Sequence, residues 1–181
     1  MHKPPHQDHG GLKVILVFVA MMGAVAFASW WLRMPSDSNL RQRFFRNESD
    51  FANLIEMSNQ DSHVILIRSN STSLDTDVSW PRQDIGFSEH RWNEYRRLFH
   101  SLKIESLTRR ADLPSCIFIT VFASGGVLGS SDKGYAYSEK PLAPVVPSLD
   151  VMPQDLYNRN KGHALVFEPL APNWYMFREE Y

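Results

Sequence analysis

The sequence predicts an α+β protein, with a single N-terminal transmembrane helix before a small domain of two or three helices packed on a mainly antiparallel sheet. Three observations support this prediction. Residues 14–32 form an uncharged apolar run, residues 89–102 repeat apolar side chains at helical spacing, and short β-rich apolar segments occupy the C-terminal half. We therefore expect four parts: a polar tail at 1–13, the membrane segment at 14–32, a juxtamembrane linker at 33–48 and the globular domain at 49–181.

The apolar run has the length of a membrane span. Its nineteen residues would form a helix of about 28 Å, close to the thickness of the hydrocarbon core of a bilayer. Trp30 and Trp31 stand just before Arg33, as in a helix that ends at the membrane interface. An A-x-A pattern ending at Ala28 is also typical of a signal-peptidase site, so cleavage after Ala28 is the alternative. We predict an uncut single-pass anchor.

Two signals in the sequence disagree about the side of the membrane on which the domain lies. Arginines that follow the run outnumber the two lysines before it, and by the positive-inside rule this would keep the domain in the cytoplasm. The signal-like leader argues for export instead, and we expect a periplasmic or other extracytoplasmic domain. Ala20, Ala24 and Ala28 recur every four residues, which leaves a homodimer through this face of the helix open.

Composition indicates a folded domain and argues against nucleic-acid binding. Apolar residues make up 43% of the chain and charged residues 22%, the balance of a globular protein. The formal net charge of −1 lacks the basic excess expected of a nucleic-acid-binding protein. The single cysteine, Cys116, excludes an intrachain disulfide and lies in an apolar segment, where a thiol tends to be inert.

The helices of the domain are predicted from caps and apolar spacing. Residues 39–46 are basic and aromatic, which suits a segment beside anionic headgroups or an ordinary amphipathic linker. Asn47 or Ser49 is expected to cap a short helix with an apolar face at Phe51 and the residues that follow. Ser88 is expected to cap the clearest helix, Glu89–Leu102.

The predicted strands are short, apolar and rich in β-branched or aromatic residues. They lie at His63–Ile67, Ile104–Leu107, Cys116–Ala123, Tyr135–Tyr137, Ala164–Glu168 and Trp174–Arg178. The glycine-rich stretch 124–134 is expected to be the loop of one hairpin, and Pro169–Asn173 the loop of another. Four prolines between residues 141 and 153 predict irregular structure there.

No motif for catalysis, metal binding or a cofactor is recognisable. The glycine-rich stretch lacks the Lys-Ser/Thr and the following helix of a phosphate-binding loop. His90 and Glu94 are four residues apart on one helix, where an exposed ion pair is the simpler interpretation than a metal site. No G-x-S-x-G nucleophile elbow is present. We predict no cofactor, no metal and no catalytic residue.

Aromatic residues near the two hairpins are the candidates for a partner-binding patch. Tyr135 and Tyr137 share one strand face, and Trp174 and Tyr175 lie in the last predicted strand. Core or cross-strand packing would account for most of them. Any that are exposed would be expected to contact a partner, because exposed aromatic area is typical of interfaces.

Four segments resemble a family of small, uncharacterised bacterial envelope proteins that carry an N-terminal signal or anchor ahead of the domain. They are MSNQDSHV, SWPRQDIGFSEHRWNEYRRLF, KGYAYS and NWYMF, and the similarity covers about Phe51–Tyr181. The resemblance implies a bacterial envelope protein. It departs from the family in one respect, since no lipobox cysteine follows the apolar run. No activity is assigned to the family, so the resemblance implies no functional residue.

An anchor joined to a domain without catalytic motifs favours a protein that acts by binding, as an envelope-associated interaction or accessory factor. Two other classes stay open: an envelope hydrolase with a site assembled from scattered residues, and a toxin-immunity-type protein. A deep pocket that holds a histidine beside a carboxylate and a hydroxyl would indicate the hydrolase. The histidines available are His63, His90, His100 and His163. A shallow, exposed aromatic patch would indicate the binding protein.

Overall fold

The structure is a computed structural model that describes residues 34–74, 86–126, 129–153, 155, 158 and 162–181. The predicted membrane segment at 14–32, including its alanine spacing and the signal-peptidase pattern, lies outside the described residues. Among those that are described, no helix is both long and apolar enough to cross a membrane. Pro35–Tyr181 forms one folded unit, and this unit has an α+β fold.

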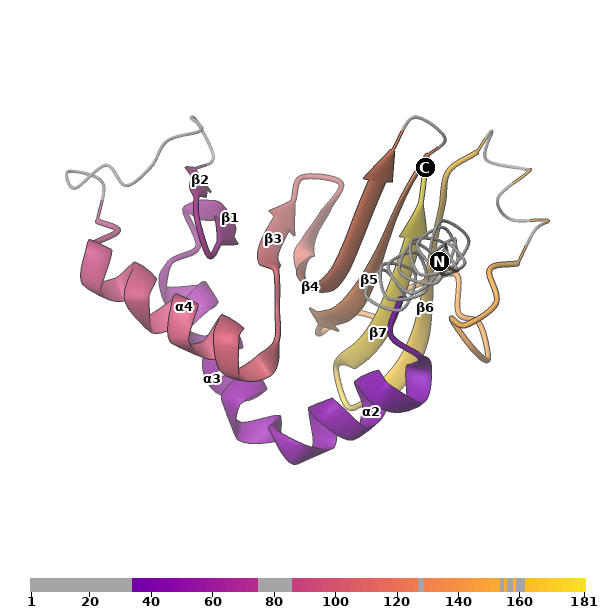
Figure 1. Cartoon of the computed structure of the whole chain (residues 1–181), viewed down its shortest axis with the longest axis horizontal. Helices are drawn as coiled ribbons and strands as arrows, with labels where there is room; N and C mark the ends of the chain where they lie inside the picture. Colours follow the sequence, from indigo (N-terminus) through magenta and orange to yellow (C-terminus); the bar gives the residue numbers. More distant parts are fainter. Residues whose placement is uncertain (1–33, 75–85, 127–128, 154, 156–157, 159–161) are drawn as a thin grey trace, which may run out of the picture. The chain divides into compact units, whose positions relative to one another are not determined.

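Three helices are described (Figure 1), and serine caps begin two of them. They are α2 (Asp37–Arg46), α3 (Glu48–Gln60) and α4 (Glu89–Leu102). The Ser36 side chain accepts a hydrogen bond from the amide of Asn39, and the Ser88 side chain accepts one from the amide of Arg91. The predicted helices α3 and α4 are confirmed, the latter at both ends. Asn47 stands at the N-cap position of α3, but its side chain donates to the carbonyl of Arg43 and makes no capping hydrogen bond.

Helix α2 differs from the linker expected at 33–48. Leu40 and Phe44 are four residues apart, so they lie on one face of the helix, and both are fully buried. The hydroxyl of Tyr135 also donates a hydrogen bond of 2.8 Å to the carbonyl of Leu40. The segment therefore belongs to the folded domain because its apolar residues are spaced to enter the core.

Seven strands form one sheet with the order β2-β1-β3-β4-β5-β7-β6 (Figure 1). All neighbouring strands pair antiparallel. The strands are β1 (Val64–Arg68), β2 (Thr72–Leu74), β3 (Ser106–Arg110), β4 (Leu113–Gly126), β5 (Gly129–Ser138), β6 (Ala164–Ala171) and β7 (Trp174–Glu180). The predicted central strand and both predicted hairpins are confirmed, and residues 139–153 form no helix or named strand.

The glycine-rich stretch is more regular than the loop predicted for it. Strands β4 and β5 continue to Gly126 and from Gly129. At Gly134 a Cβ atom would lie 2.1 Å from the carbonyl oxygen of Ile119, so only glycine fits. The glycine that suggested a turn in the sequence is instead required by the close approach of two strands.

The two faces of the sheet are covered differently. The helices pack on one face against alternate residues such as Ile117, Ile119 and Tyr135. The residues between them, Phe118 among them, form a smaller apolar cluster with Phe167 and Phe177 that includes no helix. We call this second face, on which α2, α3 and α4 do not pack, the helix-free face; it carries the polar residues described next.

Candidate functional site

A polar cleft lies on the helix-free face of the sheet, formed by two adjoining cavities. Their volumes are about 570 Å³ and 170 Å³, and both are lined by Thr108, Thr120 and Asp132. The first is also lined by Arg68, Ser69, Asn70, Ile104, Glu105, Ser106 and Ala123, and the second by Arg110, Phe118, Phe177, Glu179 and Tyr181. We call the two together the polar cleft. Ligand sites are concave and contain polar groups that converge on the ligand, so this cleft is a candidate ligand site.

The alternation of side chains along β5 and β7 places charged residues in the cleft. Asp132 on β5 pairs with Glu179 on β7, and the next pair along the strands is Lys133 with Arg178. Because successive side chains point to opposite faces, the two acids face the cleft while the two cations face the helices. The neighbouring residues Asp132 and Lys133 therefore belong to two different sites, one on each face of the sheet.

Asp132 has a half-buried carboxyl group that forms no hydrogen bond or ion pair with a described residue. Burial raises the pKa of Asp132, and the nearby carboxylate of Glu179 raises it further. Within the described part of the chain the Asp132 carboxyl has neither a hydrogen bond nor an ion pair. A carboxyl group with a raised pKa in a cleft marks a candidate functional residue, because folding alone gains nothing from it.

Two further charged groups face Asp132. Partial burial raises the pKa of Glu105, and the charge of Asp132 raises it further. Arg68 is exposed at the rim of the cleft, and among the described residues no carboxylate pairs with its guanidinium. The cleft thus presents unpaired charges of both signs, with acids in excess.

Glu179, in contrast, has hydrogen-bond partners at both oxygens of its carboxylate. Arg110 donates to both of its carboxylate oxygens at 2.7 Å and also to Asp112. His163 Nε2 lies 2.9 Å from Glu179 Oε1, and the His163 ring stacks on Tyr181. His163 lines neither cavity of the polar cleft, and Glu179 and Tyr181 beside it line only the smaller one. Asp132 is therefore the acid available to a ligand in both cavities.

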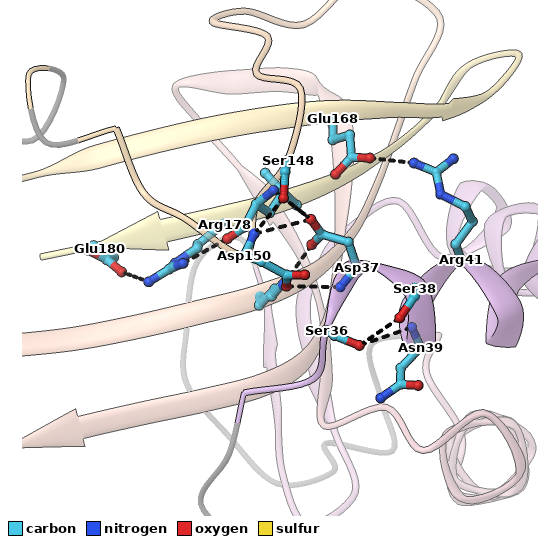
Figure 2. Close-up of polar contacts among 12 residues, drawn as sticks. Ser36, Asp37, Ser38, Asn39, Arg41, Ser148, Asp150, Glu168, Arg178 and Glu180 are labelled. Atoms are coloured by element: carbon cyan, nitrogen blue, oxygen red, sulfur yellow. Dashed lines mark hydrogen bonds and ion pairs between the residues drawn. The ribbon is translucent and has the colours of Figure 1, made fainter.

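On the opposite face a buried lysine holds the domain together. The Lys133 side chain is 1% exposed, and its ammonium lies 2.7 Å from Asp37 Oδ1 and 2.8 Å from Asp150 Oδ1. Asp37 also accepts hydrogen bonds from the Ser148 hydroxyl and the amides of Leu149 and Asp150 (Figure 2). We call Asp37, Lys133, Ser148 and Asp150 the lysine cluster. It ties the start of α2 and segment 148–150 to β5.

The pKa of Asp37 reflects this arrangement. Burial by itself would raise the pKa, but hydrogen bonds from Lys133, Ser148 and the amide of Leu149 outweigh burial and lower it to about 2. Nearby, Arg41 pairs with Glu168 and Arg178 with Glu180, and Arg178 also donates to the carbonyl of Leu149 (Figure 2). Asp37 is therefore ionised at neutral pH, which is consistent with a structural role.

The four aromatic residues singled out from the sequence are divided between core and surface. Tyr135 and Trp174 are buried under the helices, and Trp174 makes an edge-on contact with the half-buried Tyr137. Tyr175 is half-buried on the helix-free face, where it packs against Phe167. They form no single patch, so partner binding stays a prediction only for Tyr137 and Tyr175.

The other residues weighed in the sequence have ordinary roles. His90 is exposed and lies 3.7 Å from Glu94, as expected of a surface ion pair. Burial raises the pKa of the Cys116 thiol to about 12, so this thiol is unreactive. Over the described ranges, no group of three or more His, Cys, Asp or Glu side chains is placed to hold a metal ion.

The acids of the polar cleft were not predicted from the sequence, because they belong to no recognisable motif. Asp132 stands in a stretch interpreted as a loop, and Glu179 comes after the predicted end of the last strand. The one available signal was the alternation of charged residues around Lys133 and Arg178 in segments that proved to be strands.

Comparisons of this chain with protein-family models, with curated proteins and with solved structures found no match. The assignment of the site therefore depends on its geometry and charges.

Proposed function

We propose that this chain is a membrane-anchored binding protein of the bacterial envelope and that the polar cleft is its ligand site. The anchor is the apolar run at 14–32, and the envelope location follows the resemblance of the domain segments to envelope proteins. The observation that carries the proposal is the unpaired, half-buried carboxyl group of Asp132 in an open cleft.

The charges of the cleft favour a ligand that brings a cation. Neither Asp132 nor Glu105 forms an ion pair with a described residue, although the charge of the nearby Arg68 partly offsets the rise in the pKa of each. Arg110, in contrast, is paired with Asp112 and Glu179. A lysine or arginine side chain would pair with Asp132 through a charge-assisted hydrogen bond, which repays the cost of burying that carboxyl. The hydroxyl groups of Thr108 and Thr120 line the same cavities and supply further hydrogen bonds. We therefore infer a protein partner that inserts a basic side chain.

Photo-crosslinking in native membranes tests the proposal on the full chain. A photoreactive amino acid replaces Thr108 inside the cleft, and a second version carries it at the exposed Ala52 on α3. The expected result is a crosslinked species from the Thr108 position only, with the crosslink mapped close to a lysine or arginine of the partner.

Asp132→Asn is then added to the Thr108 version, with Asp50→Asn on α3 as the matched control. Loss of one buried charge-assisted pair typically costs about 2–5 kcal/mol, so the crosslink should fall more than about tenfold in Asp132→Asn and persist in Asp50→Asn. A crosslink of equal yield in Asp132→Asn would overturn the cleft as the ligand site. Release of the intact chain from membranes by alkaline carbonate would overturn the anchor.

A hydrolase is the second candidate, favoured by one observation. Glu105 and Asp132 both have raised pKa values and border the same cavity, as suits general acid–base chemistry. Chromogenic p-nitrophenyl esters and glycosides test it with the full chain. Turnover that falls about a hundredfold in Asp132→Asn would establish the hydrolase, whereas no turnover together with an Asp132-dependent crosslink favours the binding protein.

A further inference from the structure

A second surface, on the outer side of α4, has the opposite charge to the polar cleft. A cavity of about 800 Å³ lies along the C-terminal half of this helix. It is lined by Ser69, Asn93, Arg96, Arg97, Phe99, His100, Lys103 and Ile104. We call this cavity the basic groove. Its lining contains three permanent cations and a histidine but no carboxylate, although the chain as a whole is slightly acidic.

No described residue forms an ion pair with the cations of the groove. Arg97 and Lys103 form no ion pair with any described residue, since Glu94 pairs with Arg91 instead. Arg96 lies over the ring of Trp92 at 4.4 Å, a contact that orients the guanidinium but leaves its charge available. Such a cluster repels itself, so an anionic ligand is the natural complement.

Helix α2 extends the positive surface. Arg43 donates a hydrogen bond of 3.3 Å to the carbonyl of Lys103, which brings a fourth arginine or lysine side chain beside the end of α4. Arg41, in contrast, is paired with Glu168. Of the basic residues at 39–46, Arg43 therefore lies beside the groove on α4, whereas Arg41 is paired elsewhere.

We propose that the basic groove binds the phosphate groups of anionic phospholipids at the membrane surface. The proposal rests on the proposed anchoring of the chain. The apolar run ends at Leu32 and α2 begins at Asp37, so the intervening residues reach at most about 14–18 Å when extended. With so short a connection the domain stays beside the headgroups, where each arginine or lysine adds to the attraction to anionic lipid.

Charge complementarity and this short connection favour a lipid headgroup over a dissolved phosphate compound. A nearby bilayer presents anionic phosphates at high local concentration, and several weak contacts then act together. A soluble ligand would need a closed site with buried donors, whereas the groove is open and its cations are exposed or half-exposed. The groove therefore suits a surface contact that orients the domain.

Maleimide labelling of the full chain in lipid nanodiscs tests the proposal. His100→Cys places a thiol in the groove, and Ala111→Cys, in the exposed turn between β3 and β4, is the control. Cys116 is buried with a raised pKa and does not compete. In discs with about one third phosphatidylglycerol, labelling at position 100 should slow at least about fivefold relative to pure phosphatidylcholine, and the difference should vanish in about 0.5 M salt.

Charge-removing variants identify the groups responsible. Arg97→Gln/Lys103→Gln in the His100→Cys chain should abolish the protection, whereas Lys140→Gln, an exposed lysine outside the groove, should preserve it. Equal labelling in the two kinds of disc would overturn the proposal. Protection by inorganic phosphate in neutral discs, without any effect of lipid charge, would also overturn it and assign the groove to a soluble phosphate ligand.

Anchoring and lipid recognition fail in distinguishable ways. A chain that stays in the discs but shows no lipid-dependent protection refutes the groove and leaves the anchor intact. A chain that alkaline carbonate extracts, but that is protected by vesicles containing phosphatidylglycerol, refutes the anchor and supports the groove.

Discussion

Asp132 and Glu179 lie directly opposite one another on the neighbouring strands β5 and β7, so two carboxyl groups form one cross-strand pair. Like charges in this position destabilise a sheet. Arg110 compensates Glu179 through two hydrogen bonds of 2.7 Å, but Asp132 has no such partner among the described residues. A local arrangement that costs stability within a cleft is typical of a site kept for binding or catalysis.

Asp132→Asn should therefore stabilise the domain at neutral pH. The gain is expected to be about 0.5–1 kcal/mol, because the change removes the repulsion from Glu179 and leaves a neutral side chain of the same size. The pKa of Asp132 is raised by burial and by Glu179, so its ionisation costs stability as the pH rises through that value. Urea denaturation should show the difference from wild type at pH 7 and its disappearance in acid, where both side chains are neutral.

The control for this prediction is Asp50→Asn on α3, which should change the free energy of unfolding by less than about 0.5 kcal/mol. A destabilised Asp132→Asn protein would contradict the interpretation, since it would mean that the carboxylate makes a favourable contact.

Lys133→Met should destabilise the domain by about 3–5 kcal/mol, because it leaves Asp37 and Asp150 without their cation. Equilibrium denaturation measures this loss. Lys140→Met, at an exposed lysine, should have little effect. If the lysine cluster acts as a unit, adding Asp37→Asn to Lys133→Met should cost less than the sum of the two single changes.

The lysine cluster also predicts how the domain responds to acid. Asp37 has a pKa of about 2, well below the ordinary value of 3.8 for an aspartate side chain. A carboxyl group whose pKa is lowered on folding contributes stability above its unfolded value and loses it as the pH falls through the folded value. The contribution is about 2 kcal/mol, lost between about pH 4 and pH 2.

Acid titration of the unfolding free energy in wild type and in Asp37→Asn isolates this contribution. The wild-type curve should fall by about 2 kcal/mol more than the variant curve between about pH 4 and pH 2. Parallel curves would show that the pKa of Asp37 is not lowered on folding.

Two adjacent phenylalanines test whether α2 belongs to the domain. Phe44 is 0% exposed and packs among aromatic rings of the core, whereas Phe45 is 53% exposed. Phe44→Ala should cost about 3–5 kcal/mol in the free energy of unfolding, and Phe45→Ala less than about 1 kcal/mol. Thermal and urea unfolding would measure both, and equal effects would show that α2 is not fixed in the core.

Much of the fold was predictable because its signals are local. Apolar spacing and Ser88 defined α4 at both ends, and β-rich apolar runs located the central strand and the last hairpin. Helix α2 was taken for a linker because its arginines dominate its composition, while its core contacts depend on only two buried apolar side chains. The strand residues at 124–126 and 129–134 were not predicted, because Gly134 is required by a neighbouring strand rather than by a turn.

The sequence by itself determined the α+β class, most of the elements and the apolar run at 14–32, because each depends on residues close together along the chain. Only the tertiary structure decided which charged residues meet. Asp132 and Lys133 are adjacent in sequence, yet one faces a cleft opposite Glu179 and the other is buried against Asp37 and Asp150. Strand pairing and alternation set these contacts, and both depend on segments far apart in the sequence.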